Sequence, residues 1–234
     1  DIPTPIRDIY LTAELVKTTE NAYRDVQIAF ANEVALLCEN VGANVYQVRE
    51  LVNKSPYRAM HMPGAGVGGH CIPKDPWLLV HGTEGKNQAR LIPVARAVND
   101  SMPLHMVELT EEALAEVGRS IQGARVAVLG CAFIENSDDT RDAPTIPFLA
   151  RLKELGVETV VQDPYVQEYN LDLREAISGA DAVVVMVAHD RYRELDLADL
   201  REWTATPVLV DGRNVFDKEK IIFDPTTRPL ASRA

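Results

Sequence analysis

The residues with the clearest chemical potential lie in a glycine-rich segment that leads to a cysteine. Residues 64–75 read GAGVGGHCIPKD. The glycines let the backbone approach a ligand closely and expose N–H groups. Because Asp75-Pro76 is typical of a helix start, Cys71 precedes a helix N-terminus, where the helix dipole and Lys74 favour the thiolate. A thiolate is a nucleophile for an aldehyde or acyl carbon, and Asp75 is placed to hold a water or accept a proton.

A second polar group lies on the first long helix expected in the sequence. Lys17 and Asn21 are four residues apart and therefore share one helix face, which Glu14 and Asn32 extend. A lysine and an asparagine side by side can both donate to a developing oxyanion. The spacing is equally that of an ordinary solvated helix face. Cys71 likewise has the alternative of being a small buried hydrophobic residue, with Asp75 a helix cap alone.

The sequence does not predict a metal site. His61, His70 and Cys71 lack C-x-x-C or H-E-x-x-H spacing, and adjacent residues point in different directions. The other two cysteines, Cys38 and Cys131, are expected in the core. An odd number of cysteines without C-x-x-C pairs favours a reducing, cytoplasmic location over a disulfide framework.

Helices in the first half of the chain are expected to position Lys17, Asn21, Cys71 and Asp75. We expect a helix over residues 12–40, with an apolar stripe, and a shorter one over 44–53. A loop follows over 54–74, and then a helix over 88–117 that Pro103 should kink or break. The stripe of the first helix comprises Val26, Phe30, Val34, Leu37 and Val41, and the inward residues of the second are Val45, Val48, Leu51 and Val52.

After about residue 120 the pattern changes to short apolar strands that alternate with helices. Continuous β-branched runs of this kind predict a doubly wound parallel sheet covered on both faces. Because ligands bind outside the carboxyl ends of such strands, Phe133, Arg141 and Arg213 are candidates to line one crevice. The expected strands are 125–129, 159–162, 182–187 and 208–210, and the expected helices are 145–155, 173–178 and 197–203.

The net charge and the composition limit the classes of binding partner that the chain can have. The 234 residues include 35 acids and 24 Lys or Arg, for a net charge of −11. This balance argues against general nucleic-acid binding and against docking on anionic membranes. The longest apolar run, residues 182–188, is too short to span a bilayer, and the first residues do not have the pattern expected of a signal peptide. The first strand is followed by Gly130-Cys131-Ala132-Phe133 in place of G-x-G-x-x-G, so the chain carries no ordinary NAD site of its own.

Four motifs follow one another along the chain: residues 13–33, the loop GVGGHCIPKD, LGCAF with Asp138-Asp139-Thr140-Arg141, and Asp211-Gly212-Arg213-Asn214. Together and in this order they resemble the UDP-glucose/GDP-mannose dehydrogenase family. The resemblance implies three domains: an NAD-binding Rossmann domain, a central helical dimerisation domain and a UDP-sugar-binding domain. The chain resembles the last two, as residues 1–119 and 120–234, and the NAD-binding domain is expected to be absent from it.

The resemblance also implies roles for single residues. Cys71 matches the nucleophile, Lys17 and Asn21 the pair that stabilises the oxyanion, and Asp75 the carboxylate that assists water. Arg141 matches an arginine that reaches NAD. Ile134 stands where many members have Lys, so a cation that pairs with the substrate is missing there. The positions implied at the substrate are Gly68, His70, Lys74, Phe133 and Arg213, with Arg58 as an arginine donated across a dimer.

The implied activity is oxidation of the C6 alcohol of a nucleotide sugar to a carboxylate in two NAD-dependent steps, through a cysteine thiohemiacetal and thioester. The sequence around His61, His70 and Asp75 is most similar to enzymes that act on UDP-N-acetylmannosamine or UDP-N-acetylglucosamine; UDP-glucose is an alternative substrate. Without the first domain, the chain alone is expected to be inactive. Two other readings are a non-catalytic UDP-sugar-binding or dimerising module and a thiol-bearing α/β domain without ligand. The apolar surface of the long helices predicts a homodimer.

Overall fold

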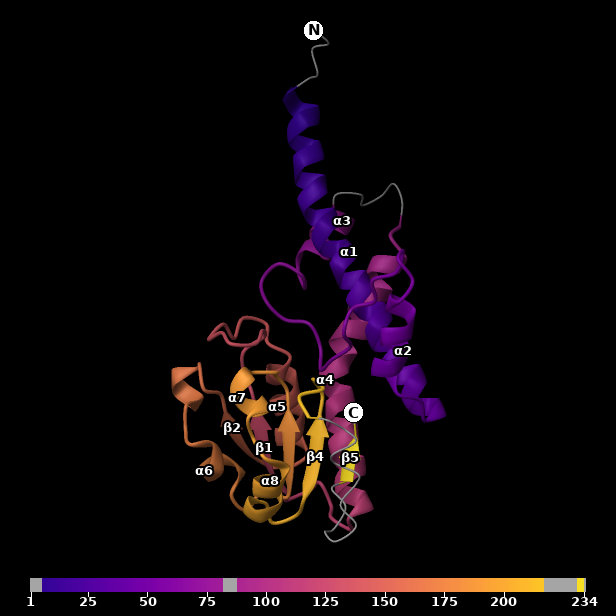
Figure 1. Ribbon diagram of the computed structural model, residues 1–234. Coiled ribbons are helices and arrows are strands. Elements are labelled where there is room, and N and C mark those ends of the chain that lie inside the picture. Colours follow the sequence, from indigo (N-terminus) through magenta and orange to yellow (C-terminus); the bar gives the residue numbers. More distant parts are fainter. Residues whose placement is uncertain (1–5, 82–87, 217–230, 234) are drawn as a thin grey trace. The chain divides into compact units, whose positions relative to one another are not determined.

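The computed structural model of the chain describes residues 6–81, 88–216 and 231–233. It divides into two compact units (Figure 1). The first, here called the helical unit, comprises Asp1–Pro63 and His70–Asp100. The second, the sheet unit, comprises Gly64–Gly69 and Ser101–Ala234. The glycine-rich segment is therefore shared: its glycines belong to the sheet unit, and Cys71 belongs to the helical unit.

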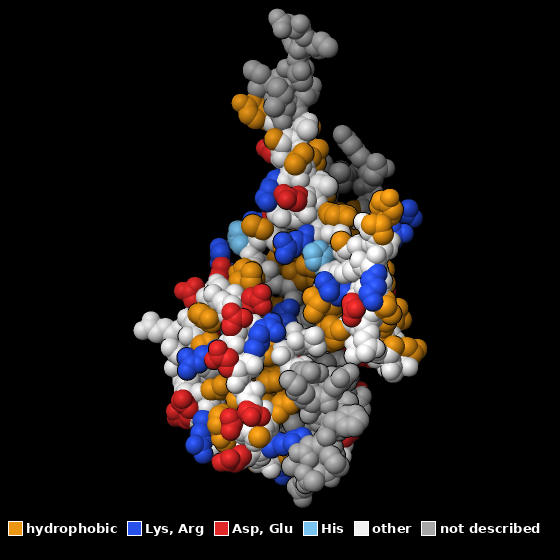
Figure 2. Space-filling model, viewed as in Figure 1, with side chains coloured by type: hydrophobic (Ala, Val, Ile, Leu, Met, Phe, Trp, Pro, Cys, Tyr) orange, Lys and Arg blue, Asp and Glu red, His pale blue; other side chains and the backbone are white. Residues whose placement is uncertain are grey.

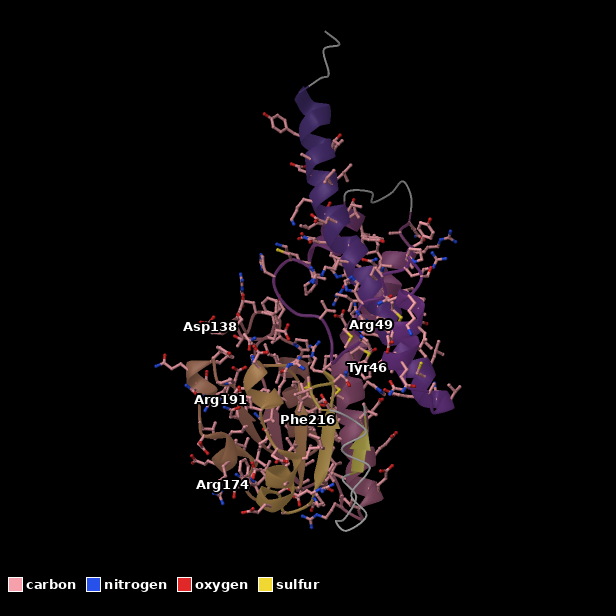
Figure 3. The ribbon with its side chains drawn as sticks, in the orientation of Figure 1. Tyr46, Arg49, Asp138, Arg174, Arg191 and Phe216 are labelled. Atoms are coloured by element: carbon pink, nitrogen blue, oxygen red, sulfur yellow. The ribbon has the colours of Figure 1, made fainter. Side chains whose placement is uncertain are left out.

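The helical unit is built from α1 (Ile6–Val41), α2 (Val45–Asn53), α3 (Asp75–His81) and the first part of α4 (Leu91–Glu116). Gly42, with φ of 70°, ends α1, because this left-handed conformation suits glycine. Asn44 then caps α2 by accepting hydrogen bonds from the N–H groups of Tyr46 and Gln47. The small apolar core between α1, α2 and the following loop consists of Ala31, Ala35, Cys38, Val45 and Met60, with Tyr46 packed against it (Figure 3).

A buried polar network joins α1 to α4. Arg96 donates through Nη1 to Asp25 Oδ1 at 2.5 Å, and Asn99 Nδ2 donates to the same oxygen at 2.8 Å. Asn32 donates to Asn99 Oδ1 at 2.9 Å. Arg96 also pairs with the more exposed Asp100. Asn32, expected on the polar face with Lys17 and Asn21, therefore contributes to this network.

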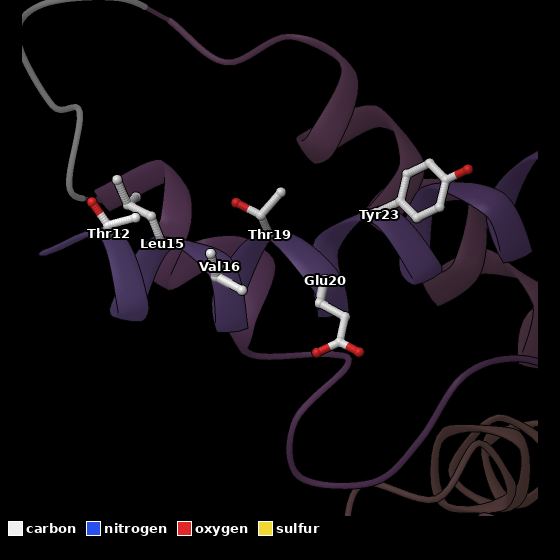
Figure 4. A pocket seen from close by; sticks show the side chains of 6 residues that line it. All are labelled: Thr12, Leu15, Val16, Thr19, Glu20 and Tyr23. Carbon is white, nitrogen blue, oxygen red and sulfur yellow. The ribbon is translucent and has the colours of Figure 1, made fainter. Parts of the chain in front are cut away.

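The apolar stripe expected on α1 is largely exposed in the single chain. Phe30 and Leu37 are each 59% exposed and Val41 is 78% exposed. On α2, the prediction of an inward position is wrong for Leu51 and Val52, which are 63% and 38% exposed. Small residues on the other face of α1 form the core, because they allow the helices to pack closely. Hydrophobic side chains accordingly gather over α1 and α2 in the space-filling view (Figure 2), and more of them line a shallow groove along α1 that comprises Thr12, Leu15, Val16, Thr19, Glu20 and Tyr23 (Figure 4).

The sheet unit contains a five-stranded sheet in the order β2-β1-β3-β4-β5, with every neighbouring pair parallel. Its strands are β1 (Arg125–Leu129), β2 (Glu158–Gln162), β3 (Ala182–Val185), β4 (Val208–Asp211) and β5 (Ala231–Arg233). Between them lie α5 (Thr145–Glu154), η1 (Gln167–Tyr169), α6 (Leu173–Ile177), α7 (Asp190–Arg193) and α8 (Leu197–Trp203). The predicted α/β fold with a parallel sheet is confirmed.

Alternate residues of β1, β3 and β4 face opposite sides of the sheet. Val126 and Val128 of β1 pack with Phe148 of α5 and Leu114 of α4, whereas Ala127 and Leu129 pack with α6, α7 and α8. Helices therefore cover both faces (Figure 1), and Phe216, beyond β4, closes the second core (Figure 3). These two layers bury the β-branched runs that predicted the strands.

Some boundaries differ from those expected. The helix expected over 88–117 spans Leu91–Glu116 and continues through Pro103, so of the kink or break expected there a break does not occur. The strand expected to reach residue 187 ends at Val185. The sequence pattern did not predict α7, η1 or β5, which are short and carry too few residues for a period.

Candidate active site

Cys71 lies in the turn that precedes α3, and its side chain is exposed. Its carbonyl oxygen accepts hydrogen bonds from the backbone N–H groups of Lys74 at 3.2 Å and Asp75 at 2.8 Å. These bonds close the turn and present the residue at its surface. The alternative that Cys71 is a small buried hydrophobic residue is therefore wrong, whereas Cys38 and Cys131 are buried as expected.

Asn21 and Asp75 meet across 54 residues of sequence. Asn21 Nδ2 on α1 donates to Asp75 Oδ2 at 2.6 Å, and both residues are buried. Asp75 therefore does more than begin α3: its carboxylate joins α3 and the Cys71 turn to the polar face of α1. An asparagine amide has two N–H donors, so one serves Asp75 and the other remains for a second acceptor.

Lys17 lies one turn before Asn21 on the same face of α1. Its side chain is 66% exposed and its ammonium is 3.6 Å from Glu20. The structure therefore brings Asn21, Asp75 and the Cys71 turn together in one unit, and leaves the Lys17 ammonium at the surface beside a glutamate.

His70 and Lys74 flank the thiol on the same turn. Lys74 Nζ lies 3.0 Å from His70 Nε2. Because an ammonium group only donates, His70 must accept at Nε2 in this arrangement and carry its proton on Nδ1. Both side chains are exposed, as a role in binding a ligand at this turn requires.

The glycines of the loop make close contacts within the sheet unit. Gly69 donates its N–H to the carbonyl oxygen of Arg141 at 2.9 Å. Gly68 faces Phe133: a Cβ atom at Gly68 would lie 2.6 Å from Phe133 Cβ and 2.7 Å from the Asp142 carbonyl oxygen. Any larger side chain at Gly68 would therefore displace the loop from Phe133. The sequence argument expected these glycines to expose N–H groups to a ligand; at Gly69 the N–H is already used by the chain.

The two candidate arginines of the sheet unit also make contacts within the chain. Arg213 lies beyond β4, donating through Nε to the Met186 carbonyl at 2.8 Å and through Nη2 to the Gly66 carbonyl at 3.2 Å. It thereby ties the glycine loop to the carboxyl end of β3. Arg141, whose side chain is 65% exposed, donates through Nε to Asp139 Oδ1 at 2.9 Å. In the helical unit, Arg58 lies on the loop after α2 and donates to the Tyr57 carbonyl at 3.1 Å.

Beyond β1, the N–H groups that hold a pyrophosphate in a dinucleotide-binding fold are used by the chain itself. Cys131 and Ala132 donate their N–H groups to Asp163 Oδ2 at 2.7 and 3.0 Å. Burial by itself raises the pKa of Asp163, but hydrogen bonds from His189 and from backbone N–H groups outweigh it and lower the pKa to about 2. An internal carboxylate thus takes the place of an anionic ligand, and the described residues at this strand end do not fit NAD.

Sequence reasoning missed the residues that organise this edge. Asp163, His189 and Asn136 follow β2, β3 and β1, and His189 hydrogen-bonds to both of the others. Their position directly after strands was the available signal, but the pairing depends on the strand order.

None of the helices in the described part of the chain is long and apolar enough to cross a membrane.

Comparison with protein families also distinguishes two parts of the chain, which correspond broadly to the helical unit and the sheet unit. Residues 11–101 match the central domain of the UDP-glucose/GDP-mannose dehydrogenase family, and residues 127–218 match its UDP binding domain. The chain belongs to this family, whose members with similar sequences are named as nucleotide-sugar dehydrogenases.

Individual relatives cover most of the chain. It is 39% identical to the UDP-N-acetyl-D-mannosamine dehydrogenase of Pyrococcus horikoshii over 91% of its own length and 50% of that protein. It is 36% identical to the NDP-N-acetyl-D-galactosaminuronic acid dehydrogenase of Ralstonia nicotianae over 90% of its length and 49% of the relative. The chain thus spans about half the length of the curated relatives it matches.

Solved structures of similar proteins share the fold. A UDP-D-ManNAc dehydrogenase from Pyrococcus horikoshii superposes with a TM-score of 0.84 at 39% identity, over 88% of this chain and 49% of that one. An NDP-N-acetyl-D-galactosaminuronic acid dehydrogenase from Methanosarcina mazei gives 0.84 at 40% identity, over 88% and 47%.

Proposed function

We propose that this chain is the substrate-side part of a cytoplasmic UDP-N-acetylmannosamine 6-dehydrogenase, with residues 1–119 as its dimerisation and catalytic-loop domain and residues 120–234 as its UDP-sugar-binding domain. The observation that carries the proposal is the exposed Cys71 on a turn fastened to the buried Asn21–Asp75 pair. NAD, held mainly outside this chain and reached by Arg141, would accept the two hydrides that leave C6.

The chemistry assigned to this chain is that of the thiol and its neighbours. Cys71 Sγ adds as thiolate to the C6 aldehyde, forming a C–S bond and an oxyanion on the same carbon. The second N–H of Asn21 and the Lys17 ammonium stabilise this oxyanion. Loss of the second hydride from this carbon converts the C–S adduct to a thioester. Asp75 then takes a proton from the water that attacks the thioester, and the thiolate leaves as the carboxylate forms.

The sheet unit is proposed to bind the nucleotide. Phe133 is proposed to contact the base, and Arg213, Gly68, His70 and Lys74 are proposed to bind the substrate. Arg58 is proposed to act on the substrate of a partner chain in a homodimer. Its place in a groove with the exposed Tyr57 and Phe30 supports this assignment, since such apolar surface is typical of an interface.

The thiol is tested in the complete enzyme, this chain joined to an NAD-binding domain. Cys71→Ala should lower turnover of UDP-N-acetylmannosamine by at least about 10⁴-fold, because it removes the nucleophile. Cys131→Ala is the matched control, since that thiol is buried, and should retain most activity. Unchanged turnover by Cys71→Ala overturns the mechanism.

The other readings make different predictions for simple measurements. Comparison of kcat/KM for UDP-N-acetylmannosamine, UDP-N-acetylglucosamine and UDP-glucose identifies the sugar. UDP binding without turnover of any of them by the complete enzyme supports the non-catalytic module. No heat on titration with millimolar UDP supports the domain without a nucleotide ligand.

A further inference from the structure

Asn136 joins the loops that leave three neighbouring strands. It lies on the β1–α5 loop in the left-handed conformation, with φ of 56°. Its backbone N–H donates to His189 Nδ1 at 2.8 Å, beyond β3. Its Nδ2 donates to Asp190 Oδ2 at 2.8 Å, and its Oδ1 accepts from the N–H of Asp190 at 3.1 Å. The same Oδ1 accepts from the Tyr165 hydroxyl, beyond β2, at 3.1 Å.

Beneath Asn136 lies a buried pair that holds the start of the same loop. His189 and Asp163 are both fully buried, with His189 Nε2 3.1 Å from Asp163 Oδ2. Because His189 Nδ1 accepts from Asn136, its proton is on Nε2 and is donated to Asp163. Asp163 Oδ2 also holds the N–H groups at the start of the loop, Cys131 and Ala132. Phe133 therefore lies between Ala132 and Asn136, the two points at which the Asp163–His189 pair holds the loop.

Asparagine suits this position for two reasons. It tolerates the left-handed conformation better than most residues, and its amide both donates and accepts. Glycine would keep the conformation but lose the side-chain bonds. Aspartate would keep the shape and the acceptor oxygen but would place a second carboxylate against Asp190.

We propose that Asn136 is a positioning residue of the nucleotide site, which fixes the loop so that Phe133 is held ready for the base. The proposal rests on the proposed function, in which Phe133 contacts the nucleotide. Asn136, Ile134 and Glu135 are exposed, so these bonds contribute to the shape of the strand-end loops and little to the apolar core. Asn136 acts through Phe133 and does not itself touch the reacting atoms.

The experiment is calorimetric titration of UDP into the wild-type chain and four variants. Asn136→Asp should weaken binding about tenfold, because the loop would then hold Phe133 in the binding position only about a tenth of the time. Asp190→Asn alone keeps an acceptor for Asn136 and should bind within about threefold of wild type. In the double variant Asn136→Asp/Asp190→Asn, the new amide can donate to the new carboxylate, so affinity should return to within about threefold of wild type. The fourth variant, Asn170→Asp, adds the same charge at an exposed position of the sheet unit and should not change the affinity.

Urea unfolding of each variant, followed by Trp203 fluorescence, separates positioning from folding. The proposal expects the midpoints of all variants to stay near that of wild type while the affinities differ. If Asn136→Asp does not fold, Asn136→Gly takes its place, with the same expected loss of affinity. Wild-type affinity in Asn136→Asp or Asn136→Gly, or a double variant as weak as the single one, overturns the proposal. Absence of UDP binding by the wild type overturns the nucleotide-site assignment itself, and this proposal with it.

Discussion

The two units bury their residues in different ways. The sheet unit buries large apolar side chains completely: Phe148 and Leu152 are 0% exposed and Leu200 is 1% exposed. The helical unit buries small residues and an Asp25–Arg96 ion pair, and leaves Phe30 59% exposed. Charged side chains are interspersed on the surface of the sheet unit, and hydrophobic side chains gather on the helical unit (Figure 2). The sheet unit thus completes its own core, whereas the helical unit leaves an apolar face of α1 exposed, which we propose a partner chain covers.

Each unit contains one of the two tryptophans, so the comparison can be measured directly. Trp77 belongs to α3 of the helical unit and Trp203 to α8 of the sheet unit. In Trp203→Phe and Trp77→Phe backgrounds, fluorescence during urea unfolding reports on one unit at a time.

The largest expected effect is at the buried ion pair. Asp25→Ala leaves the Arg96 charge buried, since Arg96 is 1% exposed, and should cost about 3 kcal/mol of unfolding free energy detected by Trp77. The matched control is Asp100→Ala, which removes the partner whose side chain is 61% exposed and should cost less than about 1 kcal/mol. Equal losses in the two variants would contradict the difference in burial. If Trp203 detected the same loss as Trp77, the units would unfold together and the comparison would fail.

This network also marks the limit of what the sequence predicted. Local sequence patterns located α5 and β1 to within one residue, and α1 apart from its first turns, because a regular element repeats its pattern locally. Asp25 and Arg96 are 71 positions apart, and no local pattern signals their pairing. The stripe of α1 was recognised as apolar, but periodicity cannot distinguish a face buried in the chain from one left for a partner.

The candidate site, too, could be predicted from the sequence only in part. The types and order of Cys71, Asn21 and Asp75 suggested their chemistry, and these roles stay predictions. The hydrogen bond between Asn21 and Asp75 depends on how α3 packs against α1, which spacing does not encode. The Asp163–His189 pair depends on the strand order β2-β1-β3, which brings residues from two separate crossovers together.

An intermediate effect is expected when the sheet unit is acidified. The pKa of Asp163 is about 2 in the folded chain, below its ordinary value of 3.8. The ionised carboxylate therefore contributes stability that is complete above about pH 4 and is lost as pH falls to 2, about 2 kcal/mol in all. Trp203-detected unfolding should show this loss in the wild type, and Asp163→Asn should lack it. Burial raises the pKa of Asp25 in the helical unit, against the lowering effect of Arg96, so Asp25 contributes no such loss. Identical pH profiles for the wild type and Asp163→Asn would refute the assignment.

The smallest effect on folding, and the sharpest test of the comparison, is expected on the exposed face of α1. Phe30→Ser should change the unfolding free energy of the separated chain by less than about 0.5 kcal/mol, because the side chain is already 59% exposed. Its effect should appear in association: the dimer dissociation constant measured by sedimentation should rise at least about tenfold, since an aromatic side chain buried in an interface contributes more than 1.4 kcal/mol. Ile146→Ser on α5 is the control from the sheet unit, with a side chain 52% exposed, and should leave association unchanged. A monomeric wild type at micromolar concentration, or equal changes in both variants, would mean that the exposed face of α1 is not the surface that completes the helical unit.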